Sequence, residues 1–201
     1  MPDPVRFALI LPEEWEVLDL DPATRDASTD RLLRRRIGGG DSLAPQRRAA
    51  GVAYRSLLHD AAEAGAFFAA STGKEVGGLR LAASVLAFLV PLPLGADGQP
   101  IGVDEMVTTL AEPEAEELRE PPAVVELPVG RSVRVRGRMG AGVKASTGEE
   151  PRIDEVRFYV PMAEWGMLFV LVFSTPSLPA ADAFAEVFDL LARTARWKVA
   201  S

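Results

Sequence analysis

The chain has 201 residues, a formal net charge of −7 at pH 7, 48% hydrophobic residues and no cysteine. Such a chain can bury a core and fold as a single domain, residues 1–201, rather than stay disordered. The negative charge argues against nucleic acid as a partner, and the lack of cysteine excludes disulfides, thiolate metal sites and cysteine nucleophiles. The longest apolar segment, 81–94, is broken by prolines and falls short of the roughly 18 apolar residues of a membrane span. We therefore expect a cytoplasmic protein with no integral membrane segment.

The N-terminal third predicts a hairpin-like pair of strands followed by two helices. In order, these are strands over 5–11 and 15–20 and helices over 22–37 and 41–70. The triple glycine at 38–40 separates the helices, because consecutive glycines stop a helix. The second helix carries one apolar stripe at spacings of three and four residues. We interpret residues 21–70 as a helical insertion.

The remainder predicts an antiparallel meander that ends in a helix. The expected elements are one long or two short strands over 76–90, a short helix over 103–110, strands over 124–127, 132–138, 153–161 and 166–174, and a helix over 179–197. Residues 91–122 are rich in proline and acid and predict an exposed connection. Strands that pair antiparallel and pack against helices define an α+β fold, with an antiparallel β-sheet flanked by α-helices.

Three arginines alternate along one predicted strand. Arg134, Arg136 and Arg138 are separated by Val133, Val135 and Gly137, so the guanidiniums share one face of the strand. Such a basic ladder suits a ligand carboxylate, a phosphate or an acidic helix of a partner. Pairing with the acidic residues at 149–150 and 154–155 accounts for the same pattern and is the simpler interpretation.

Enzymatic chemistry has little support in the sequence. His59 is the only histidine, and no Gly-x-Ser-x-Gly motif is present. Gly38 to Gly40 follow no strand and precede no Lys-Ser/Thr pair, so they do not form a phosphate loop. The acids between 112 and 120 lack the interleaved glycine of a calcium loop. We expect no enzyme, and no catalytic, cofactor or metal site.

Aromatic and aliphatic residues follow one another without alternation in the strand 167–173, so both faces of the sheet need covering. A face that stays partly uncovered would dock a hydrophobic or amphipathic helix. Phe158 and Phe169 are candidates for that contact if they are exposed, together with the arginines Arg134, Arg136 and Arg138.

Several segments together resemble the PsbP-like fold, a family that includes LpqN-like lipoproteins and Eag-type secretion chaperones. They are the strand 7–11 with Pro12 and Trp15, the strand 156–160, the strand 168–173 with Ser174-Thr175-Pro176, and the helix 184–197. The resemblance implies an α/β/α sandwich, with an antiparallel sheet between helices, and a non-enzymatic role. The helical insertion at 21–70 departs from the family's pattern.

From the resemblance we expect a bacterial, secretion-associated adaptor or chaperone that docks a hydrophobic or amphipathic segment of a partner protein. A small-molecule-binding domain or hydrolase is the first alternative, and it would use Arg134, Arg136 and carboxylates. A structural homo-oligomer, such as a homodimer that buries the same apolar face on itself, is the second.

Overall fold

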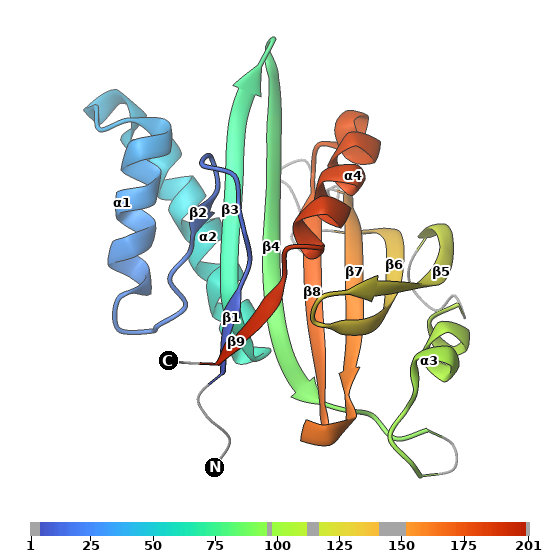
Figure 1. The fold of residues 1–201 in the computed structure, drawn as a ribbon. Coiled ribbons are helices and arrows are strands. Elements are labelled where there is room, and N and C mark those ends of the chain that lie inside the picture. Colours follow the sequence, from blue (N-terminus) through green and yellow to red (C-terminus); the bar gives the residue numbers. More distant parts are fainter. Residues whose placement is uncertain (1–4, 96–97, 112–116, 141–151, 200–201) are drawn as a thin grey trace.

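A computed structural model describes residues 5–95, 98–111, 117–140 and 152–199. Its centre is a seven-stranded antiparallel sheet in the order β2-β3-β4-β8-β7-β6-β5 (Figure 1). The strands are β2 (Glu16–Val17), β3 (Ala66–Val76), β4 (Leu79–Pro91), β5 (Glu117–Leu127), β6 (Gly130–Gly140), β7 (Arg152–Met162) and β8 (Met167–Thr175). A second sheet pairs β1 (Val5–Ala8) with β9 (Arg196–Val199).

Helices cover both faces of the seven-stranded sheet. They are α1 (Arg25–Ile37), α2 (Ala44–Glu63), α3 (Val103–Leu110) and α4 (Ala181–Ala192). We call the face under α4 and the β1–β9 pair the front face, and the face under α1, α2 and α3 the back face. The α+β class with a helix-flanked antiparallel sheet is thereby confirmed. In the described part of the chain, no helix combines the length and the apolarity needed to cross a membrane.

The main core lies on the front face, where alternate residues of the central strands point. Val85, Leu171 and Phe173 are fully buried there, and Phe188 of α4 stacks on Phe173 with ring centroids 5.0 Å apart. Burial of this apolar surface is the main force that holds α4 on the sheet.

The predicted N-terminal hairpin is wrong, because β1 pairs with β9 and β2 pairs with β3. Phe7 of β1 instead enters an aromatic cluster with its ring centroid 5.3 Å from Phe169 and 5.5 Å from Trp197. The closing helix predicted over 179–197 is also too long. In the structure α4 ends at Ala192, and Trp197 lies in β9. Aromatic burial between the two ends of the chain outweighs the local preference for a hairpin and for a longer helix.

The helix predicted over 41–70 is also too long, because α2 ends at Glu63. Gly65 follows with φ of +86°, a conformation that stops a helix and that glycine adopts without steric cost. The chain then pairs along β3 with β4. Gly77 and Gly78, with φ of +58° and +80°, form the turn between these two strands, as a hairpin turn requires.

The C-terminal meander is confirmed, with β5, β6, β7 and β8 as sequential neighbours. The short helix predicted over 103–110 is confirmed as α3. The predicted connection 91–122 contains this helix and the start of β5, which begins at Glu117 rather than at 124. The two long predicted helices near the N-terminus become α1 and α2, which pack together over β3 and β4 on the back face.

Candidate functional site

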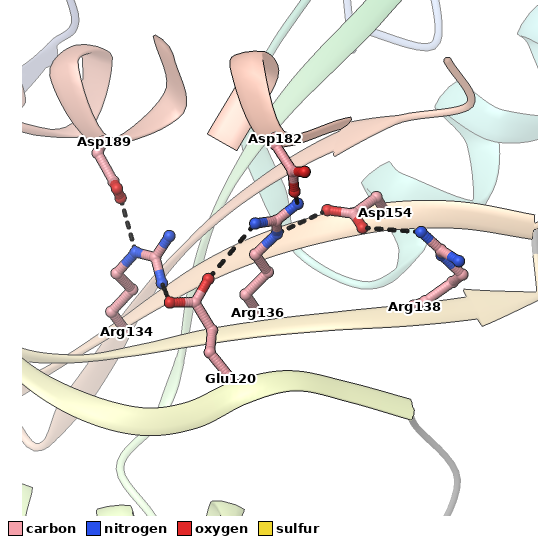
Figure 2. A network of polar contacts seen from close by, with 7 residues as sticks. All are labelled: Glu120, Arg134, Arg136, Arg138, Asp154, Asp182 and Asp189. Atoms are coloured by element: carbon pink, nitrogen blue, oxygen red, sulfur yellow. Dashed lines mark hydrogen bonds and ion pairs between the residues drawn. The ribbon is translucent and has the colours of Figure 1, made fainter. Parts of the chain in front are cut away.

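Arg134, Arg136 and Arg138 lie on the front face of β6, as their alternation predicts. Their cross-strand neighbours on β7 are Phe158, Val156 and Asp154. Figure 2 shows the guanidiniums among carboxylates that come from β5, β7 and α4. We call this set of seven residues the arginine ladder; its acidic members are Glu120, Asp154, Asp182 and Asp189.

Arg136 is at the centre of the ladder. Its Nε donates to Oδ1 of Asp154 at 3.0 Å, and its Nη2 donates to Oδ1 of Asp182 at 2.6 Å. Its Nη1 lies 3.5 Å from Oε1 of Glu120. One guanidinium therefore joins β5, β7 and the first turn of α4.

Arg134 makes the second connection to α4. Its Nε donates to Oδ1 of Asp189 at 2.7 Å, and its Nη1 lies 3.1 Å from Oε2 of Glu120. Arg138 is held more loosely, with its Nη2 3.7 Å from Oδ2 of Asp154. Its buried Nε has no hydrogen-bond partner in the described part of the chain.

Charge pairing shifts the ionisation of the ladder. Burial alone would lower the pKa of Arg134, but hydrogen bonding to Asp189 and the charges of Asp189 and Glu120 raise it. Burial opposes the charge of Arg136 in the same way, and its hydrogen bonds to Asp182 and Asp154 raise the pKa. The hydrogen bond from Arg136 lowers the pKa of Asp182. The pairing thus favours the charged forms of Arg134, Arg136 and Asp182.

The ladder suits a structural role better than anion binding. Its three guanidiniums face four carboxylates, so the set carries no excess positive charge. Asp154, one of the acids that the sequence pairs with the arginines, is the fully buried member, while the predicted partners at 149–150 lie outside the described residues. A role for the three arginines in partner binding stays a prediction.

Phe158 and Phe169 do not meet the condition of exposure under which they were candidates. They are 1% and 0% exposed and belong to the front core. The reason is that their strand positions point toward the face that α4 and the β1–β9 pair cover. A partner cannot reach either ring on the folded surface.

The other sequence candidates remain apart in space. His59 is exposed on α2. Within the described ranges, no group of three or more histidine and carboxylate side chains is placed to hold a metal ion, and residues 112–116 of the acidic segment lie outside those ranges. A cavity of about 410 Å³ adjoins Arg134 and Asp189, but these two groups already pair with each other. The cavity therefore offers few unpaired charges to a substrate.

The back face contains an apolar area that the sequence did not single out. We call it the open strip, and it consists of three cross-strand pairs of β4 and β8: Ser84 with Ser174, Leu86 with Val172, and Phe88 with Val170. All six side chains are partly exposed, whereas the residues between them on the same strands face the front core and are buried. The two strands are central in the sheet, yet one of their faces is incompletely covered.

Helices border the open strip on both sides. On one side, Leu57 of α2 is 48% exposed and lines, with Tyr54, Ser84 and Leu86, a groove of about 240 Å³ between α2 and β4. On the other side, α3 covers the part of the back face formed by β6. Val170 packs at the edge of the hydrophobic cluster between α3 and the sheet. The strip is thus an apolar floor beside α2. On the side of α3, the ion pair of Glu155 with Arg157 on β7 adjoins Ser174 and Val172.

Alternation along β4 and β8 separates the residues of the strip from those of the front core. In 84–88 and 170–174, every second residue belongs to it. Because both faces of these strands are apolar, however, the pattern does not reveal which face the helices leave uncovered. That depends on how far apart α2 and α3 pack.

No protein-family model matches the chain, and no curated protein is similar to it at a significant level. Among solved structures, the chain is similar to LpqN, described as involved in cell envelope biogenesis of Mycobacterium tuberculosis. The TM-score is 0.46 and the identity 8%, with 98% of this chain and 86% of that chain covered. Of the predicted resemblance, a distant likeness in fold to LpqN is found. The resemblance to PsbP and to Eag-type chaperones stays a prediction.

Proposed function

We propose that this chain is a non-enzymatic binding protein that docks a hydrophobic or amphipathic helix of a partner protein on the open strip. The observation that carries the proposal is the partly exposed back face of β4 and β8, the two central strands of the sheet. Central strands of a sheet flanked by helices are normally covered on both faces. An apolar floor left open there favours an additional helix from outside.

The spacing of the two helical walls matches one missing helix. On the back face, α2 contacts β3, and α3 contacts β6 and its neighbour β5. Four strand spacings separate β3 from β6, which is about 19 Å at about 4.8 Å per spacing. Packed helices lie about 8–10 Å apart, so one additional helix between α2 and α3 would pack against both at ordinary distances.

The chemistry of the strip favours an amphipathic helix over a purely polar one. Leu86, Phe88, Val170 and Val172 form the apolar part, and Leu57 extends it onto α2. At one end, the hydroxyls of Ser84 and Ser174 lie 2.7 Å apart. Hydroxyl groups can accept or donate a further hydrogen bond, so this end suits a polar side chain or a helix terminus of the partner.

The proposal is tested by a charge inserted into the groove wall. The protein is purified from its native host by affinity, and the mass of the complex is measured by light scattering for the wild type and for Leu57→Asp. Docking would bury Leu57, and burying a leucine contributes about 1.5–3 kcal/mol, so the carboxylate should weaken the complex at least about tenfold. Leu57 is exposed enough that the variant should still fold, which circular dichroism checks.

Val52→Asp is the matched control. Val52 lies on the same helix and is 65% exposed, but it does not line the groove. We expect this variant to keep the partner. Equal binding by wild type and Leu57→Asp would refute docking on the strip, as would a particle that contains only copies of this chain, which would favour the homo-oligomer. A secretion-associated adaptor or chaperone is the class to which we assign the protein if the partner is a secreted protein with an apolar helix.

A further inference from the structure

A second cavity, of about 410 Å³, lies at the end of the sheet where β7 turns into β8. The turn contributes Glu164 and Trp165, β7 contributes Pro161 and Met162, and β9 contributes Trp197. The volume falls within the roughly 300–1,000 Å³ of small-molecule sites. The cavity is separate from the open strip, because its Trp197 wall belongs to the β1–β9 pair on the front face.

Two tryptophans form the walls of this cavity. Their ring centroids are 6.0 Å apart and their planes are inclined by 65°. Trp197 is fixed from behind by Phe7 and Phe169, at centroid distances of 5.5 and 5.2 Å. Trp165 is 45% exposed although it is a large apolar side chain in a short turn. One wall is therefore preformed, and the other presents an indole that the fold itself does not bury.

The charge in the cavity is negative and unpaired. Glu164 is the one charged residue among the described residues that line it. It has no hydrogen bond or ion pair with any residue in the described ranges. Arg196 and Lys198 flank Trp197, but neighbouring residues of a strand point to opposite sides, so their charges face away from the cavity.

We propose that this cavity binds a methylated ammonium group. A cation is attracted to the faces of indole rings and to the carboxylate of Glu164. The remaining lining is apolar and offers side-chain contacts to methyl groups; it consists of Val129, Pro161, Met162 and Ala163. A primary ammonium would bring three N–H donors, and the lining side chains provide a single carboxylate to accept them. A trimethylammonium group has no donor to satisfy and therefore fits this lining better.

Choline and its neutral isostere 3,3-dimethylbutan-1-ol are the probes, titrated into the full chain by calorimetry. Cation–π attraction predicts that choline binds about tenfold or more tightly than the isostere. Trp165→Ala should abolish binding, and Glu164→Gln should weaken it several-fold. Glu186→Gln on α4, which lies outside the cavity, should leave it unchanged. Both lining residues are exposed, so these variants should fold like the wild type.

Equal affinity for the two probes, or no saturable binding of choline, would overturn the proposal. Co-flotation with phosphatidylcholine vesicles separates two sources of the same group. Flotation that Trp165→Ala abolishes would assign the group to a lipid headgroup, and choline binding without flotation would assign it to a free molecule. Because the cavity and the open strip share no residue, the Leu57→Asp variant should bind choline normally.

Discussion

Replacing Asp154 with asparagine tests whether the arginine ladder stabilises the fold. Asp154 is 1% exposed, its Oδ1 accepts a hydrogen bond from Arg136 at 3.0 Å, and its Oδ2 lies 3.7 Å from Arg138. Removing one partner of a buried ion pair typically costs about 3–5 kcal/mol, because the other charge stays buried. Arg136 keeps Asp182 and Glu120 in the variant. We therefore expect the free energy of unfolding to fall by about 2–3 kcal/mol, below the full range for a broken pair.

Urea unfolding followed by tryptophan fluorescence measures this loss. With a slope of about 2–3 kcal/mol per molar urea, the midpoint should fall by about 1 M. Asp182→Asn is the matched control, since it removes another carboxylate from Arg136 but at a position that is 83% exposed. The reasoning is refuted if the two variants have the same midpoint. The double variant Asp154→Asn with Arg138→Met should recover part of the loss, because it removes the guanidinium that would have no ion pair left within the described ranges.

Two further predictions concern the stability of the fold at acid pH and the glycine that follows α2. The hydrogen bond and charge of Arg136 lower the pKa of Asp182 below its ordinary 3.8, so the ionised carboxylate stabilises the fold above that pH and the gain disappears as the pH falls through the lowered pKa. The difference in unfolding free energy between wild type and Asp182→Asn should thus shrink from about pH 6 to about pH 2, and a constant difference would contradict this cause. Gly65→Ala should cost about 1–2 kcal/mol in thermal melts because φ is +86° there. Gly39→Ala, with no atom within 4 Å of the added methyl group, should have little effect, and equal melting temperatures would count against backbone strain at Gly65.

Alternation in β6 correctly placed three guanidiniums on one face. The identity of their partners was only partly predictable. Asp154 is close in sequence and was anticipated, whereas Asp182 and Asp189 come from α4. No local pattern specifies that α4 packs on β7 and β8 with Asp182 and Asp189 within reach of β6, because the direction of α4 depends on how its apolar side packs on the front core.

The residues of the candidate docking site also differ from those predicted, because they depend on how the helices pack on the sheet. The sequence indicated that an apolar sheet face could stay uncovered, and it offered Phe158 and Phe169 as possible contacts. Both turn out to face the front core, and Leu86 and Val172 are partly exposed on the back face instead. The sequence of a strand that is apolar on both sides does not show which side the helices cover.

Local chemistry is sufficient for much of this protein: the antiparallel meander, the short helix α3 and the shared face of the arginines follow from periodicity and turn residues. The pairing of β1 with β9 and the uncovered back face of β4 and β8 required the folded chain. Each of these depends on contacts between segments far apart in sequence, such as Phe7 against Trp197. The free energy of such contacts comes from burial that exists only after the layers have assembled, so the order of residues along the chain does not reveal it.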